Sequence, residues 1–172
     1  MGSVTPDLLA DLLDAHADAL ELFAAQWSLA PADVVQEAFV ELARQPEVPQ
    51  NAKAWLYRVV RNRAISEARS AARRRRRERN VSSAATEAGA WFRAISGAEL
   101  DPADAAEAIG ELADEMREVV VARIWGGLTF EQIGEMSGIS AATAFRRFEA
   151  AIGLLRTRLG LPCPNQKTSP KI

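Results

Sequence analysis

The sequence predicts an all-α protein built from two small helical domains and a flexible linker. Apolar residues recur every three or four positions along most of the 172 residues, and no strand-like alternation of useful length interrupts them. Prolines and capping residues divide this pattern into segments of ordinary helix length. A stretch of small polar residues then breaks it. We expect a first domain over 1–79, a linker over 80–100, a second domain over 101–160 and a flexible tail over 161–172.

Three helices are expected in the first domain. Pro6 and a stripe of apolar residues predict a helix over 6–28, and Pro31 begins a second one that runs to 44. The segment "PEVPQNAKA" carries two prolines and an asparagine, which end that helix and form a loop. A long third helix starts at 51 or 52 and continues into five consecutive arginines, Arg73 to Arg77.

The third helix has an apolar face and a basic face. On a wheel of about 100° per residue, Leu56 and Val60 share one side, while Arg58, Asn62 and Arg69 share another. Arg63 and Glu67 fall near the apolar stripe, where we expect them to form an i,i+4 ion pair.

The second domain is expected to contain four helices. Asp101 and Pro102 start the first of them, a break near 113 or 114 separates the next, and Gly126–Gly127 ends it. The following pair reads as a helix-turn-helix, with Thr129 and Ser140 as N-caps, Gly138 at the turn and Gly160 after the last helix. Ile133, Ile139 and Ala144 would face the core, with Gly134 where the two helices cross.

The formal net charge of −2 conceals a strong partition along the chain. Residues 1–50 sum to −8, residues 53–79 to +9, and the remainder to −3. Such segregation indicates one surface for a polyanion and other surfaces for different partners.

Several classes of protein find little support. There is no phosphate-binding glycine loop, no nucleophile–histidine set and no convincing pair of carboxylates, so we expect no enzyme and no cofactor. The lone His16 is expected to be a packing residue and the lone Cys163 incidental, which leaves no metal site and no internal disulfide. No apolar run is long enough to span a membrane and the first residues are acidic, so we expect no membrane insertion and a cytoplasmic location.

Two stretches together resemble the extracytoplasmic-function (ECF) group of bacterial RNA polymerase sigma factors, in the sigma-70 family. "DVVQEAFVEL" followed by "AWLYRVVRNRAISEAR" looks like the paired helices of sigma region 2, and "GLTFEQIGEMSGISAATAFRRF" looks like the helix-turn-helix of region 4. The resemblance implies a factor that binds core RNA polymerase, recognises and melts promoter DNA, and starts transcription. Many relatives are held inactive by an anti-sigma protein, which the resemblance makes a further candidate partner.

The resemblance also implies three sets of site residues. The core polymerase-binding set is Asp33, Gln36, Glu37 and Phe39. The set that holds the melted −10 element by phosphate contact and stacking is Asn51, Lys53, Trp55, Arg58, Arg61, Asn62, Arg69, Arg73 and Arg74. The helix-turn-helix set that reads the −35 element is Thr129, Ser140, Ala141, Ala142, Thr143, Arg146 and Arg147.

Some alternatives stay open at this point. Trp55 is more easily explained by core packing than by stacking on a base, and Trp91–Phe92 in the linker either tucks against a domain or anchors a partner. The arginine run either contacts phosphates or is a solvated helix end. The protein as a whole could instead be a stand-alone helix-turn-helix regulator that binds duplex DNA without polymerase.

Overall fold

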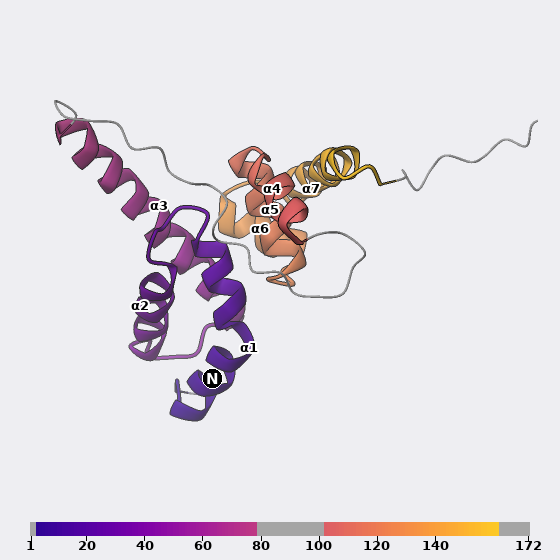
Figure 1. Cartoon of the computed structure of the whole chain (residues 1–172). Helices are drawn as coiled ribbons and strands as arrows, with labels where there is room; N and C mark the ends of the chain where they lie inside the picture. The colour runs from indigo at the N-terminus through magenta and orange to yellow at the C-terminus, as the bar shows by residue number, and fades with distance from the viewer. Residues whose placement is uncertain (1–2, 79–101, 162–172) are drawn as a thin grey trace, which may run out of the picture.

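The computed structural model describes residues 3–78 and 102–161, and within these ranges the chain forms seven α-helices and no strand (Figure 1). The helices are α1 (Pro6–Ala24), α2 (Pro31–Ala43), α3 (Ala52–Glu78), α4 (Pro102–Gly110), α5 (Asp114–Ile124), α6 (Phe130–Ser137) and α7 (Ala141–Arg158). The predicted all-α class is confirmed. The linker with Trp91–Phe92 and the tail with Cys163 lie outside the described residues.

The first helix ends four residues earlier than the sequence predicts. Beyond Ala24 the chain forms a turn, in which the Trp27 amide donates to the Ala24 carbonyl at 3.0 Å. The Ser28 hydroxyl then accepts from the Ala30 amide at 3.1 Å. This local bond redirects the backbone into α2, because a serine side chain competes with helical hydrogen bonding.

Helices α1, α2 and α3 form an N-terminal bundle, from which the C-terminal half of α3 projects (Figure 1). Its core is centred on Phe23, whose ring meets Tyr57 edge-on with centroids 5.1 Å apart and Trp27 at 5.3 Å. The apolar face predicted for α3 is confirmed, since Leu56 and Val60 are fully buried. The opposite face of α3 is left for solvent or ligands.

Helices α4 to α7 form a C-terminal unit that contains the predicted helix-turn-helix. Thr129 begins α6 with a reciprocal capping box to Gln132, and Ser140 caps α7 by accepting from the Thr143 amide. Gly138 turns the chain between them at φ 71°, a conformation that favours glycine. At Gly134 an added Cβ would lie 2.7 Å from the Ile139 carbonyl oxygen, so the close helix crossing requires this glycine.

The two units share one apolar core cluster, and a second cluster lies within the C-terminal unit. Buried side chains of α1 and α3, including Leu20 and Tyr57, belong to the same cluster as Ala122, Leu128 and Ile133 of the C-terminal unit. The Tyr57 ring fits against Gly126, where an added Cβ would lie 2.9 Å from the ring. In Figure 1 the C-terminal unit accordingly lies directly beside the N-terminal bundle. No helix in the described ranges is long and apolar enough to cross a membrane.

Candidate functional site

The predicted polymerase-binding residues lie on α2. Asp33, Gln36 and Glu37 are exposed along one side of the helix and border a depression of about 750 Å³. Phe39, by contrast, is only 8 % exposed. Its ring lines an apolar groove between α1 and α2 together with Leu9 and Val40. The α2 surface therefore presents carboxylates beside a groove with an apolar floor.

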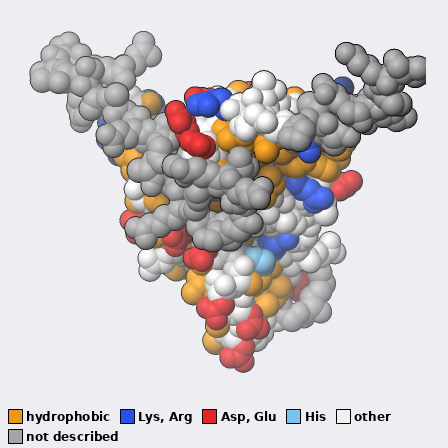
Figure 2. Space-filling view, turned by 45° about the vertical axis from the view of Figure 1, so that its right-hand side comes forward, with side chains coloured by type: hydrophobic (Ala, Val, Ile, Leu, Met, Phe, Trp, Pro, Cys, Tyr) orange, Lys and Arg blue, Asp and Glu red, His pale blue; other side chains and the backbone are white. Residues whose placement is uncertain are grey.

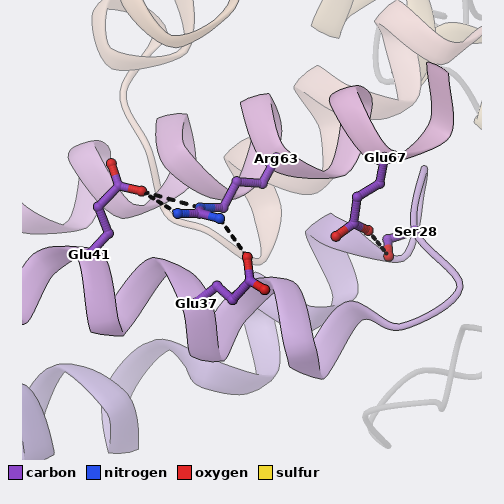
Figure 3. Close-up of polar contacts among 5 residues, drawn as sticks. All are labelled: Ser28, Glu37, Glu41, Arg63 and Glu67. Carbon is purple, nitrogen blue, oxygen red and sulfur yellow. Dashed lines mark hydrogen bonds and ion pairs between the residues drawn. The ribbon is translucent and has the colours of Figure 1, made fainter. Parts of the chain in front are cut away.

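Arg63 of α3 holds the acidic side of α2 in place (Figure 3). Its guanidinium donates to Glu41 at 2.6 Å and to Glu37 at 2.5 Å. Glu67, one turn further along α3, accepts instead from the Ser28 hydroxyl at 2.9 Å. The expected Arg63–Glu67 ion pair is therefore wrong, because carboxylates and hydroxyls of the neighbouring elements lie closer to each partner.

Most of the predicted basic surface of α3 is exposed. Arg58, Asn62 and Arg69 lie in solvent on one side of the helix, as the wheel predicts. Arg73 and Arg74 are exposed near its far end, and Arg73 donates to the Ser70 hydroxyl at 2.8 Å. This row of exposed cations is suited to phosphate groups, which bind guanidinium strongly and without regard to sequence.

The start of α3 lies beside a small cavity of about 350 Å³. Asn51 caps the helix by accepting from the Ala54 amide at 2.9 Å, and Trp55 and Arg58 line the cavity. Trp55 is partly buried and also packs against the apolar core. Gln132 and Glu135 of α6 also line this cavity.

Two residues of the predicted −10 set form polar contacts with the C-terminal unit. Arg61 forms an ion pair with Glu118 of α5, its Nε donating at 2.5 Å and its Nη2 at 3.2 Å. Lys53 donates from Nζ to the Gly127 carbonyl oxygen at 2.9 Å. Arg61 and Lys53 therefore differ from Arg58 and Asn62, which face solvent.

The helix-turn-helix residues cluster at the start of α7. The Ser140 and Thr143 hydroxyls lie 2.9 Å apart, and Arg146 donates to Thr143 at 3.3 Å. Ala142 and Arg146 are exposed, whereas Ala141, Thr143 and Arg147 are half-buried and Thr129 caps the preceding helix. Phe145, also exposed, stacks edge-on against Phe130. The exposed N-terminal turns of α7 thus present hydroxyls and a guanidinium around small side chains.

Glu118 and Tyr57 lie at the contact between the two units, a position that was not predicted from the sequence. Glu118 is 5 % exposed and accepts from both Arg61 and the Ser137 hydroxyl at 2.5 Å. A carboxylate directly before the apolar run Val119–Val121 was an available signal, since such a residue is seldom buried without partners. No comparable signal marked Tyr57, whose burial depends on the distant Gly126.

No group of three histidine, cysteine or acidic side chains in the described residues could hold a metal ion. The pKa of His16 is lowered, first by partial burial and then by the nearby charge of Lys53.

Acidic side chains gather at the lower end of the face in Figure 2, where α1 lies in Figure 1.

Comparison with known proteins identifies the class. Residues 15–74 match the Sigma-70 region 2 family and residues 108–157 match Sigma-70, region 4, so the chain carries both modules of a sigma-70-type factor in the expected order. The ECF RNA polymerase sigma factor SigL of Mycobacterium tuberculosis is 33 % identical over 162 residues, which cover 88 % of this chain and 89 % of SigL. The chain therefore belongs to the ECF RNA polymerase sigma factors, and the resemblance found in the sequence is confirmed.

Solved structures agree with this assignment. The sigma factor RpoE of Bartonella quintana, in complex with the anti-sigma factor NepR, superposes with a TM-score of 0.72 at 26 % identity. That match covers 92 % of this chain and 100 % of RpoE, so it includes both helical units. CnrH, in complex with the cytosolic domain of CnrY, has a TM-score of 0.58 at 23 % identity over 91 % of this chain and 90 % of CnrH, and supports the fold alone.

Proposed function

We propose that this ECF sigma factor divides its work among the three surfaces described above. Sigma factors of this family bind core RNA polymerase and direct promoter recognition and initiation. We assign core polymerase to the acidic side of α2, the melted −10 element to the basic side of α3, and the −35 element to the helix-turn-helix. The observation that carries this division is the separation of charge between α2 and α3.

The polymerase assignment is supported by the chemistry of α2. Asp33 and Glu37 are exposed carboxylates beside the apolar groove, a combination that fits a basic partner with an apolar ridge. Arg63 fixes Glu37, whereas Asp33 forms no ion pair in the described part of the chain. Glu37 would therefore meet a partner cation in a fixed orientation, and Asp33 would be available for a new ion pair.

The DNA assignments follow from exposed cations and hydroxyls. Arg58, Asn62, Arg69, Arg73 and Arg74 offer phosphate contacts along α3, and Trp55 offers a partly exposed ring for an unstacked base. On α7, Ser140, Thr143 and Arg146 are placed at the N-terminal turns, which are the part of a recognition helix that enters the major groove.

Substitution of the α2 carboxylates tests the polymerase assignment. We expect D33N/E37Q to weaken binding to core polymerase about tenfold, a loss typical of charge pairs at a protein interface. Glu41 still holds Arg63 in this variant, so the fold should be preserved. The control D14N/D18N removes the same charge from exposed positions of α1 and should bind core normally. Unchanged core affinity in D33N/E37Q would disprove the docking assignment.

A separate readout tests the DNA assignment. Reversing the charge of exposed Arg58 (R58E) should reduce promoter opening by the reconstituted holoenzyme while leaving core affinity unchanged. Arg58 is preferable to Arg61 here because Arg61 also pairs with Glu118. An equal loss in both assays would contradict a role in DNA contact.

Measuring initiation with and without core polymerase separates this function from that of a stand-alone regulator. A sigma factor gives promoter-dependent initiation only with core polymerase, whereas a regulator binds duplex DNA without it.

We propose that the chain acts where polymerase acts, in the cytoplasm, and that its role is binding rather than catalysis. An anti-sigma protein is proposed as a further partner, since the RpoE relative is seen with one. The domain division at 79, 100 and 160 likewise remains our proposal.

A further inference from the structure

The contact between the two units uses two side chains of the predicted −10 set, on the side of α3 that the proposed function gives to DNA. Arg61 and Lys53 belong to the basic surface of α3, yet Glu118 and the Gly127 carbonyl occupy them. Around these polar contacts, Tyr57 and Gly126 pack against each other within the shared apolar core. The contact is therefore both apolar and specific in its charges.

Glu118 is built into this contact as a buried anion. Its side chain is 7 % exposed, and its carboxylate accepts from Arg61 Nε and Nη2 and from the Ser137 hydroxyl. A buried carboxylate requires such donors, because removal from water is costly unless it is paired and hydrogen-bonded. A phosphate binds arginine in the same way, with two of its oxygens accepting from one guanidinium. Glu118 thus occupies Arg61 in the manner of a DNA phosphate.

We propose that Glu118 is an internal substitute for DNA phosphate, which holds the free protein in a closed state and masks Arg61 until the units separate. This inference rests on the proposed function, since masking has meaning only if Arg61 contacts DNA. It goes further by naming the residue that competes with DNA and the contact that must break.

The distance between the promoter elements requires such an opening. The positions that name the −35 and −10 elements place them about 25 base pairs apart, which is about 85 Å at about 3.4 Å per base pair. In the structure α3 packs on α6 and α6 on α7, so two interhelix spacings of about 8–10 Å separate the basic face from the recognition helix. In the closed state the two surfaces cannot reach their promoter elements at the same time. Binding to a full promoter therefore has to break the Arg61–Glu118 pair.

The test removes the charge of Glu118 and measures closure and DNA binding separately. Closure is followed by the distance between spin labels at two exposed positions, D14C on α1 and A150C on α7, with C163S to remove the native thiol. DNA binding is followed without polymerase, using a labelled mixed-sequence single-stranded oligonucleotide. The matched control is E115Q, which removes the same charge from an exposed position of α5.

We expect the protein that retains Glu118 and the E115Q variant to give mainly a short label distance and weak DNA binding. E118Q should lengthen or broaden the distance and bind the oligonucleotide about tenfold more tightly, as expected if about one molecule in ten is open before the substitution. Adding R61Q to E118Q should remove the gain in DNA binding while leaving the molecule open. This last result would identify Arg61 as the group released.

Two outcomes would overturn the inference: an unchanged label distance in E118Q, or opening without tighter DNA binding. Should E118Q fail to keep its helical circular dichroism, S137A carries the test, because it removes one donor from Glu118 without changing charge. A smaller shift in the same direction is expected there, and no shift would also count against the proposal. Failure of the proposed function would appear separately, as absence of initiation with core polymerase.

Discussion

Tyr57 combines a large apolar contact with a polar atom that the described residues do not satisfy. Its side chain is fully buried between Phe23 and Gly126, and its hydroxyl has no hydrogen-bond partner in residues 3–78 and 102–161. Burial raises the pKa of this phenol far above its ordinary value, so the hydroxyl stays neutral at every physiological pH. A buried hydroxyl without a partner costs about 1–3 kcal/mol.

The substitution Y57F should therefore stabilise the protein. We expect the free energy of unfolding to rise by about 1 kcal/mol, because the ring keeps its contacts while the unpaired hydroxyl is lost. Urea unfolding monitored by circular dichroism measures this change. Y57A is the comparison, and should cost about 3–5 kcal/mol through the cavity it leaves. A loss of stability in Y57F would mean that the hydroxyl does have a partner in solution.

The ion pairs on α2 and α3 show how a residue's partner depends on its surroundings. Arg63 binds Glu37 and Glu41 of α2 rather than Glu67 of its own helix. The helical spacing permitted an Arg63–Glu67 pair, but exposed i,i+4 pairs contribute only about 0.3–0.5 kcal/mol. Such a small preference is easily outweighed by two carboxylates on the adjacent helix.

At the scale of elements, two glycines in the helix-turn-helix unit have opposite roles. Gly134 lies in α6 and packs against the turn that leads into α7. An added Cβ there would lie 2.7 Å from the Ile139 carbonyl oxygen. Gly153 lies within α7 and has open space around the corresponding position. The helix crossing needs the first glycine, whereas the second only weakens its helix.

The paired substitutions G134A and G153A test this difference. G134A should destabilise the protein by about 1–3 kcal/mol, the usual cost of overpacking, and should reduce binding to −35 duplex DNA by shifting α7. G153A should stabilise it by about 0.5–1 kcal/mol, because alanine is the better helix former. Thermal unfolding of both variants gives the answer. Equal effects of the two would show that the close crossing at Gly134 is absent in solution.

At the scale of the whole molecule, the shared core should couple the two units in folding. Ile133 of α6 is fully buried in the same cluster as Leu20 of α1 and Tyr57 of α3. Separate units would unfold independently, whereas a common core makes the opening of one expose the other.

The substitution I133A therefore should affect both units. We expect a loss of about 2–5 kcal/mol from the cavity, together with faster amide hydrogen exchange in α1 and α3 as well as in α6. Exchange measured by mass spectrometry, peptide by peptide, distinguishes the cases. Faster exchange confined to α5, α6 and α7 would show that the N-terminal bundle is stable without the contact.

Most of the individual elements could be predicted from the sequence, because their causes are local. Helical periodicity, prolines at helix starts, the capping residues Thr129 and Ser140, and the left-handed Gly138 act within a few residues of their own position. The same holds for the basic face of α3, since one helix wheel determines which of its residues share a side. The family resemblance rested on these local motifs as well.

Tertiary structure alone decided which of these groups meet. Glu118 lies 57 residues from Arg61 and Gly126 lies far along the chain from Tyr57, and no local pattern specifies either contact. Both depend on how two units with their own helices bury the apolar surface that remains on each. The helices, their charges and the family therefore follow from local sequence. Packing, by contrast, brings Arg61 and Lys53 against the protein's own C-terminal unit. The reason is that burial free energy is gained wherever complementary apolar faces meet, regardless of their separation along the chain.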